Sequence, residues 1–179
     1  MSVAFLVDGV TEQRFVQLVC KSSTVQRINL NGTSVQTVAL AKRIATQIRL
    51  WNGRHRSIVV IVDLEKRQQS ANDFSSELLG ALVAEGAGVG VVVGVADRMI
   101  ENWMLGDEEV WPGQALPAVV DGFSGATLVK SIMASAYDKA AHGPELLRRV
   151  RSSELKKRSP SFAALHAQLS HLRCHWLSR

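Results

Sequence analysis

Residues 57–64 read SIVVIVDL, and this stretch decides the fold. Its apolar side chains occupy consecutive positions and most are β-branched, which is typical of a parallel strand buried on both faces. The apolar run ends at Asp63, and Glu65 follows two positions later. A second run of this kind, GVGVVVGVA at residues 88–96, predicts another buried strand. The two runs predict the centre of a mainly parallel sheet.

Strand and helix patterns alternate outward from these two runs. Apolar, β-branched segments predict strands and apolar residues at helical spacing predict helices. The expected strands are residues 3–7, 25–30, 57–64 and 88–96, and the expected helices are 12–21, 35–51, 74–85 and 98–105. Alternation of this kind predicts βαβ units with right-handed crossovers. We therefore expect an α/β fold, Rossmann-like and doubly wound, with helices on both faces of the sheet.

The strand pattern stops after residue 112. Helical patterns remain at residues 125–137, 144–151 and 161–176. From Arg148 onward the chain has eight basic residues and one acid, a net charge of +7, whereas the preceding part has a net charge of −2. We expect residues 1–112 to form the α/β core and residues 113–179 a helical, basic extension packed on it, in one compact domain.

The basic extension has two readings. A stripe of basic residues is the electrostatic footprint of a polyanion site, but it is also a common solvated helix face. We expect the segment before Ser159-Pro160 to form an exposed turn that reaches phosphates, because proline restrains the residue before it. The candidate phosphate contacts in this extension are Arg149, Lys156, Lys157 and Arg158.

The composition indicates a folded protein of one domain. The chain has 179 residues, 46% apolar and 21% charged, which is close to globular averages. The first 20 residues lack a basic signal-peptide start and no apolar run approaches membrane-spanning length, so we expect a cytoplasmic protein without membrane association. Cys20 and Cys174 are the two cysteines, and we expect both to be reduced and neither to be a nucleophile.

Three other classes of site have weak support. A zinc site built from His166, His171, Cys174 and His175 is not expected, because only His171 and His175 share a helix face. No Walker-type phosphate loop is present, so the chain itself is not expected to be an ATPase. Tryptophans at apolar positions are more often core than base-stacking residues. We expect this of Trp51, Trp103, Trp111 and Trp176.

Acidic residues follow three of the four expected strands. Asp8 follows the first strand, Asp63 and Glu65 end the central one, and Asp97 ends the next, with Glu101 one helical turn later. Because one residue separates Asp63 from Glu65, we expect their side chains to point to the same face of an extended segment. Parallel sheets gather these strand ends along one edge, where open α/β proteins bind ligands. Five carboxylates there would repel, so we expect them to hold Mg²⁺ or Mn²⁺. Any single acid has the alternative role of a helix cap or a solvated turn residue.

Four motifs resemble one family. DGVTEQRF at residues 8–15 resembles the first TOPRIM motif, and VDLEKR at 62–67 resembles the TOPRIM Asp-x-Asp motif. IENWMLGD at 100–107 resembles the IExWLLAD segment of small stand-alone bacterial TOPRIM-like proteins related to the OLD-family nucleases, a group largely of unknown function. Lys130, the Tyr137-Asp-Lys139 segment and RSPSF at 158–162 resemble the C-terminal pattern of that group. The resemblance covers most of the chain.

This resemblance implies a metal-dependent TOPRIM nuclease that hydrolyses phosphodiester bonds of DNA, with RNA as the alternative substrate. It also implies a setting in bacterial defence against phage or plasmids, a separate ATPase as partner, and a homo-oligomer as one assembly state. Lys130 and Lys139 join the candidate nucleic-acid contacts. The implied catalytic residues are Asp8, Glu12, Asp63, Glu65 and Glu101. Glu12 has the alternative role of a helix N-terminal charge.

Two departures from the family pattern leave a rival open. Asp8 stands where the family usually has Glu, and Glu65 stands where it usually has Asp. Both keep the charge but move the carboxylate by one methylene, and Mg²⁺ is strict about geometry. The rival is a catalytically weak TOPRIM module that binds nucleic acid or a partner ATPase as a regulatory subunit.

Overall fold

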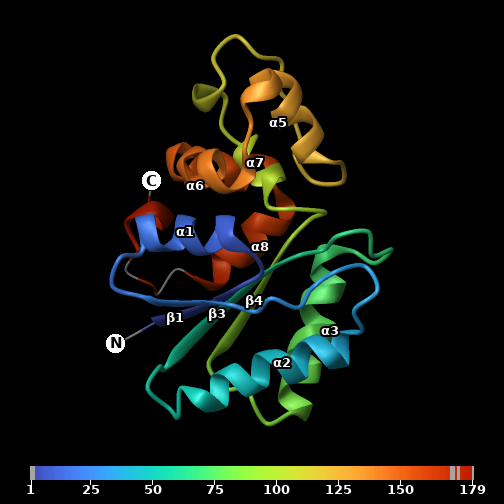
Figure 1. The fold of residues 1–179 in the computed structure, drawn as a ribbon, viewed down its shortest axis with the longest axis vertical. Coiled ribbons are helices and arrows are strands. Elements are labelled where there is room, and N and C mark those ends of the chain that lie inside the picture. The colour runs from blue at the N-terminus through green and yellow to red at the C-terminus, as the bar shows by residue number, and fades with distance from the viewer. Residues whose placement is uncertain (1–2, 170–171, 173, 179) are drawn as a thin grey trace.

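The computed structural model describes residues 3–169, 172 and 174–178. These residues form a four-stranded, all-parallel sheet in the order β2-β1-β3-β4 (Figure 1). The strands are β1 Val3–Val7, β2 Thr24–Arg27, β3 Ser57–Asp63 and β4 Val91–Ala96. The strand order reverses between β1 and β3, which makes that gap the topological switch point of the sheet. The predicted doubly wound α/β fold is confirmed.

Helices α2 and α3 cover one face of the sheet (Figure 1). α2 is Thr37–Leu50 and α3 is Ala71–Ala84. Their apolar residues recur at helical spacing, so one side of each helix packs on the strands. This half of the core contains Leu6, Leu40, Ile44, Val60, Val62, Phe74, Leu78 and Val93.

On the opposite face α1 and α8 contact the strands, α6 packs on α1, α7 packs on α8, and α4 packs on α6. Their bounds are α1 Val10–Val19, α4 Glu101–Met104, α6 Lys139–Arg149, α7 Ser152–Arg158 and α8 Pro160–Gln168. Aromatic rings from distant parts of the chain meet there, because Trp176 packs edge-on against Phe15 at 4.9 Å and against Phe162 at 5.2 Å. The segment after residue 112 therefore shares this half of the core. All four tryptophans are buried, as predicted.

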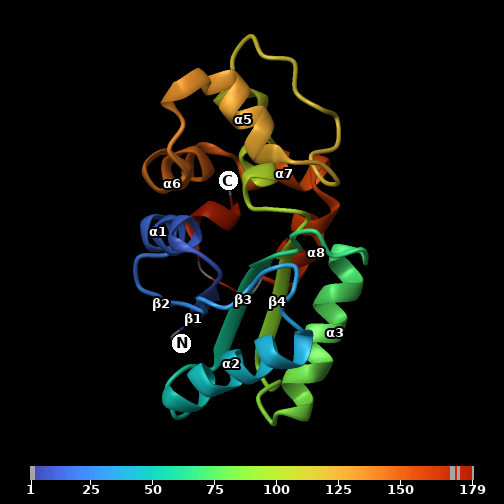
Figure 2. The same cartoon turned by 45° about the vertical axis from the view of Figure 1, so that its right-hand side comes forward.

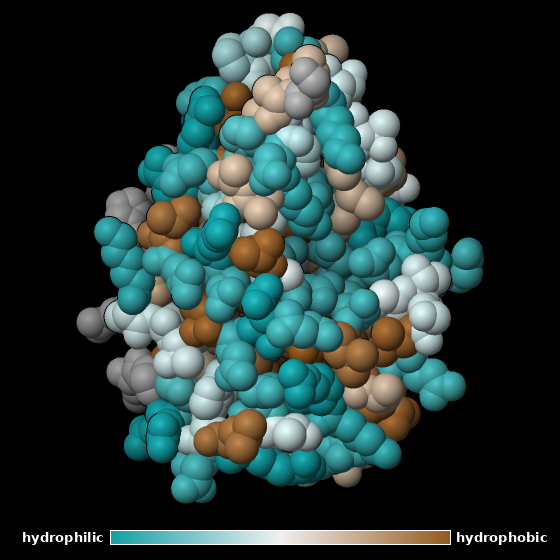
Figure 3. Space-filling view, in the orientation of Figure 1, coloured by the Kyte–Doolittle hydropathy of each residue, from teal (hydrophilic) through white to brown (hydrophobic). Residues whose placement is uncertain are grey.

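The remaining helix, α5 Gly125–Met133, lies at the end of the molecule away from α2, as the two views agree (Figure 2). Short 3-10 turns complete the described elements, at Glu108–Val110, Ala134–Ala136 and His175–Ser178. The face seen in Figure 3 is mostly hydrophilic, with separated hydrophobic groups. No helix among the described residues is both long enough and apolar enough to cross a bilayer.

Helices α1 and α6 approach each other closely. Pro144 lies inside α6 and has no N–H, so the Ala140 carbonyl lacks its usual helical partner. The Arg14 guanidinium on α1 donates to that carbonyl at 2.7 Å. Thr11 donates from its hydroxyl to the Lys139 carbonyl at 3.1 Å. A Cβ added at Gly143 would lie 2.7 Å from Thr11 Cγ2, so the contact requires glycine.

Two local predictions for the C-terminal part are wrong. Residues 161–176 do not form one helix, since α8 ends at Gln168 and the chain continues to a separate 3-10 turn. Residues 156–158 form the last turn of α7 rather than an exposed turn. The helix continues that far because the change of direction comes at Ser159, whose hydroxyl accepts from the Phe162 N–H at 3.1 Å and caps α8.

The expectation of two reduced cysteines is also wrong. Cys20 and Cys174 form a disulfide, with sulfur atoms 2.15 Å apart. The cause is the fold: the end of α1 and the C-terminal segment meet on the same face of the sheet, which sets the two Cα atoms 5.4 Å apart. The bonded Cys174 has no thiolate to offer zinc, and His171 of the weak zinc candidate lies outside the described residues.

Candidate functional site

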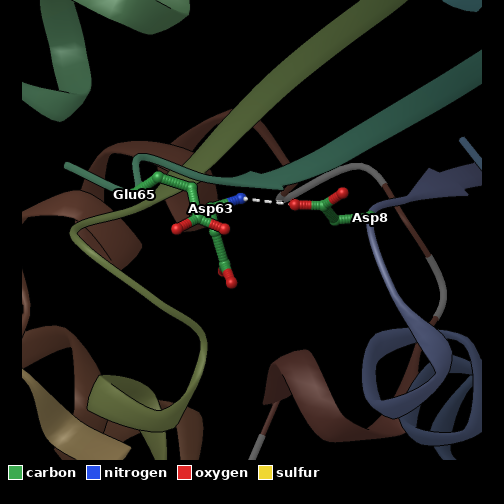
Figure 4. Close-up of side chains that lie close together, drawn as sticks. All are labelled: Asp8, Asp63 and Glu65. Carbon is green, nitrogen blue, oxygen red and sulfur yellow. Dashed lines mark hydrogen bonds between the residues drawn. The ribbon is translucent and has the colours of Figure 1, made fainter. Parts of the chain in front are cut away.

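Asp8 and Asp63 face each other across the switch point. Asp8 directly follows β1 and its N–H donates to the Ile61 carbonyl at 3.1 Å, which extends the strand pairing. The Asp63 N–H points at Asp8 Oδ2 at 3.5 Å (Figure 4). Asp8, Asp63 and Glu65 each offer a carboxylate oxygen, and these oxygens lie within 4.8 Å of one another. Three of the five predicted metal ligands therefore meet at the predicted edge of the sheet.

Glu65 reaches this group by a different route from the one expected. β3 ends at Asp63, and Glu65 has a left-handed backbone with φ 59°, so the two side chains do not share a face through strand alternation. Its N–H donates to the Arg98 carbonyl at 2.8 Å. The Arg98 guanidinium donates to the Arg67 carbonyl at 3.0 Å. A tight turn fixed by the neighbouring strand connection therefore brings Glu65 back toward Asp63.

Glu12 is buried beside the three carboxylates, with 2% of its surface exposed. Its Oε2 accepts from the Gly9 N–H at 3.1 Å, so the expected role at the start of α1 is present. Burial raises the pKa of Glu12, and the charges of Asp8 and Glu101 add to this while Lys139 opposes it. Glu12 is thus within the electrostatic reach of the acidic group.

Lys139 lies at the acidic site, although 45% of its side-chain surface is exposed. Its Nζ is 3.1 Å from Oε1 of the buried Glu101. Burial lowers the pKa of Lys139, but the charges of Glu101, Asp63 and Glu12 outweigh it and raise the pKa overall. Lys139 was predicted as a phosphate contact. The structure gives it an acidic partner from α4, so Lys139 is a cation of the site.

The surroundings of Asp63 strongly disfavour the charged form of its carboxyl group. Burial raises its pKa well above the ordinary value, and the nearby charges of Glu12, Asp8 and Glu101 raise it further. Lys139 lowers it only in part. A buried cluster of carboxylates with too few cations matches the ligand set that hard divalent cations prefer. The residues present therefore fit Mg²⁺ or Mn²⁺.

Asp97 does not join the group of three carboxylates found among the described residues. Its Oδ1 lies 3.7 Å from Arg98 Nε. Burial raises the pKa of Asp97, and the charge of Asp121 adds to this. Asp121 in turn accepts from the Ser161 N–H at 2.8 Å and from the Ser159 hydroxyl at 2.8 Å. Asp97 thus belongs to a polar cluster at the start of α8.

Two of the other candidate phosphate contacts pair with acids outside the candidate site. Lys157 pairs with Glu154 at 2.7 Å. Arg158 is half-buried, forms an ion pair with Glu108 and donates to the Pro117 carbonyl at 3.3 Å. The exposed candidates are Lys130, Arg149, Lys156 and Lys157. Their contact with nucleic acid stays a prediction.

Two residues of the site were missed. The Asn31 amide donates to Asp8 Oδ2 at 2.6 Å, and the Arg67 guanidinium donates to Asn31 Oδ1 at 3.0 Å. The sequence signal for Asn31 was the Asn-Gly pair at 31–32, which indicates a turn and says nothing of what the amide contacts. Arg67 is the last residue of the VDLEKR motif, and the resemblance implies no role of its own for it.

Comparison of the chain with protein-family models, with curated proteins and with solved structures finds no match. The relation to TOPRIM proteins therefore stays a prediction that rests on the four motifs, and the site is interpreted from its own geometry.

Proposed function

We propose that this protein is a metal-dependent phosphodiesterase of TOPRIM type that cuts DNA, with RNA as the alternative substrate. The observation that carries the proposal is the convergence of oxygens from Asp8, Asp63 and Glu65 within 4.8 Å at the switch point of a parallel sheet. The proposed setting is the bacterial cytoplasm, in defence against phage or plasmids, with a separate ATPase as partner and self-association as one assembly state.

The roles of the chain's own residues follow from charge and burial. Asp8, Asp63 and Glu65 would hold Mg²⁺ or Mn²⁺, which when bound supplies positive charge to a phosphate and acidifies a bound water. Glu12 has a raised pKa that favours its protonated form, so it is the candidate proton donor or acceptor. Glu101 holds Lys139, whose ammonium would face the same phosphate.

Nicking of supercoiled plasmid DNA in Mg²⁺ or Mn²⁺ tests this proposal. We expect nicking by the wild-type protein and a loss of at least about 100-fold in Asp63→Ala, since removing a ligand removes the cation's contribution. Glu145→Gln is the matched control, because Glu145 is an exposed acid on α6 that pairs with Arg148. Equal nicking by wild type and Asp63→Ala would identify a contaminating nuclease and defeat the proposal.

The rival function, a regulatory module with weak catalysis, has one observation in its favour. Nζ of Lys139 already lies 3.1 Å from Oε1 of Glu101. Its positive charge partly offsets the rise in the pKa values of Asp63 and Glu12 that burial causes. An internal cation of this kind can stabilise an acidic cluster without a metal. Nucleic-acid binding by a protein that binds no Mn²⁺ would favour this rival.

A further inference from the structure

The side-chain amide of Asn31 joins the two strands at the switch point. Its Nδ2 donates to Asp8 Oδ2 at 2.6 Å and to the Asp63 carbonyl oxygen at 2.9 Å. An amide nitrogen carries two hydrogens, so these two bonds use its full donor capacity. Asn31 thereby connects the carboxylate that follows β1 to the end of β3.

The partners of Asn31 permit one orientation of its amide. Arg67 Nη2 donates to Asn31 Oδ1 at 3.0 Å. A guanidinium can only donate, whereas the Asp8 carboxylate and the Asp63 carbonyl can only accept. Turning the amide over would place its oxygen against two acceptors and its N–H groups against a donor. Arg67 therefore selects the orientation in which Asn31 holds Asp8.

Arg67 is itself held in place from several sides. The two hydrogens of its Nη2 are shared among Asn31 Oδ1, the Gly32 carbonyl at 3.1 Å and the Val35 carbonyl at 3.2 Å, and its Nη1 donates to the Leu64 carbonyl at 3.2 Å. The guanidinium carbon lies 4.3 Å from the centre of the Phe74 ring. The planar fork of arginine suits such multiple bonding, and lysine does not reproduce it.

We propose that Asn31 is a positioning residue of the metal site, and that Arg67 orients it, so that the Asp8 carboxylate is held at ligand distance from Asp63 before a cation arrives. This inference rests on the proposed function, because it assigns a purpose to the same carboxylates. Partners that orient metal ligands typically contribute about 10- to 100-fold in metal affinity. Asn31→Leu keeps the approximate shape of the side chain and removes both donated bonds.

The first test uses the metal-free protein and NMR of side-chain amides. The two Asn31 amide protons are assigned by their absence in Asn31→Leu. We expect them to exchange with water at least about tenfold more slowly than those of Asn72, which is exposed on α3. Arg67→Lys should accelerate the exchange at Asn31. Exchange as fast as that of Asn72 in the wild-type protein would overturn the inference.

The second test is calorimetric titration with Mn²⁺. Asn31→Leu should weaken Mn²⁺ binding about 10- to 100-fold, Arg67→Lys should weaken it less, and Asn72→Leu should leave it unchanged. Leu82→Ala separates positioning from stability, because Leu82 is a buried core residue outside the site. That variant should unfold more easily and bind Mn²⁺ with wild-type affinity while it is folded.

The outcomes distinguish this inference from the proposed function. If wild type binds Mn²⁺ and Asn31→Leu binds it equally well, the inference is overturned and the metal site stands. If wild type binds no Mn²⁺, the proposed function is overturned, and the inference with it, whatever the amide exchange shows. If Asn31→Leu does not fold, Arg67→Lys decides, and wild-type affinity in that variant overturns the inference.

Discussion

The backbone N–H of Glu65 donates to the carbonyl oxygen of Arg98 at 2.8 Å, and both residues have left-handed backbones, with φ 59° and 63°. These residues follow β3 and β4, which pair in parallel. Left-handed conformations are costly for residues other than glycine and cluster at functional sites. The connection after β4 therefore holds a candidate ligand that follows β3.

This backbone makes a prediction about Glu65. Glu65→Gly should be more stable than Glu65→Ala by about 1 kcal/mol, because glycine adopts positive φ without a Cβ clash. Urea unfolding of the metal-free protein measures the difference. Glu85 is the matched control, because its φ is −79°. At this position Glu85→Gly should be less stable than Glu85→Ala. Equal stability of the two Glu65 variants would contradict the strained turn.

The contact between α1 and α6 predicts an unusual effect of alanine. Gly143→Ala should destabilise the fold by about 1–3 kcal/mol, because the added methyl would overlap the stiff Thr11 side chain. Gly80→Ala in α3 should instead stabilise by about 0.5–1 kcal/mol, because nothing lies within 4 Å of its added Cβ. Thermal unfolding of both variants provides the measurement. A stabilised Gly143→Ala would disprove the close approach.

The buried acids predict a pH dependence of stability. The folded-state pKa of Asp63 is raised above its ordinary 3.8, so the folded protein holds a proton that the unfolded chain releases. The protonation of Asp63 therefore contributes fully to the stability of the fold below pH 3.8. This contribution should be lost as the pH rises through the folded-state pKa of Asp63. Glu12, raised from 4.5, acts in the same direction.

Urea unfolding in a metal chelator, over about pH 4 to pH 8, measures this dependence. Asp63→Asn should flatten the loss of stability with rising pH, and Glu145→Gln should retain it. A wild-type free energy of unfolding that rises with pH across this range, with no change in Asp63→Asn, would be inconsistent with buried, mutually repelling carboxylates.

The basic end of α7 predicts a salt-dependent contribution to nucleic-acid binding. Replacing Lys156 and Lys157 together with alanine should weaken binding regardless of sequence, and should reduce the salt slope by about 0.9 for each lost phosphate contact on duplex DNA. Arg158 is left intact because it bonds Glu108 and the Pro117 carbonyl. Filter binding across a salt series gives the slope.

The control for that experiment is a double alanine variant of Lys21 and Lys42, exposed residues outside the C-terminal part. It should bind as wild type does. Unchanged affinity and slope in the Lys156 and Lys157 variant would make that end of α7 a solvated face. The search for a nucleic-acid track would then move to Arg43, Arg49, Arg54 and Arg56.

The fold could be predicted because its strands carry a local signal. The runs at 57–64 and 88–96 are apolar on both faces, and only a buried parallel strand explains such a pattern well. Asp8 and Asp63 could be placed at one edge because strand ends in a parallel sheet meet there. The left-handed turn at Glu65 could not be predicted, because it depends on a backbone hydrogen bond to Arg98, a residue far along the chain.

The features that the sequence did not predict also depend on contacts between residues far apart in the chain. Cys20 and Cys174 are separated by 154 residues, and their spacing contains no information on whether they meet. Asn31 follows the short edge strand β2 in a loop, where neither periodicity nor charge distinguishes it. The resemblance implies only a nucleic-acid contact for Lys139, because its pairing with Glu101 depends on the packing of α6 against α1 and α4.

Calorimetric titration of the metal-free protein with Mn²⁺ tests the central claim most directly, namely that Asp8, Asp63 and Glu65 together hold a divalent cation. We predict saturable binding by the wild-type protein, none in Asp63→Asn, and wild-type binding in Glu145→Gln. Absence of binding by the folded wild-type protein, or equal binding by wild type and Asp63→Asn, would contradict the account.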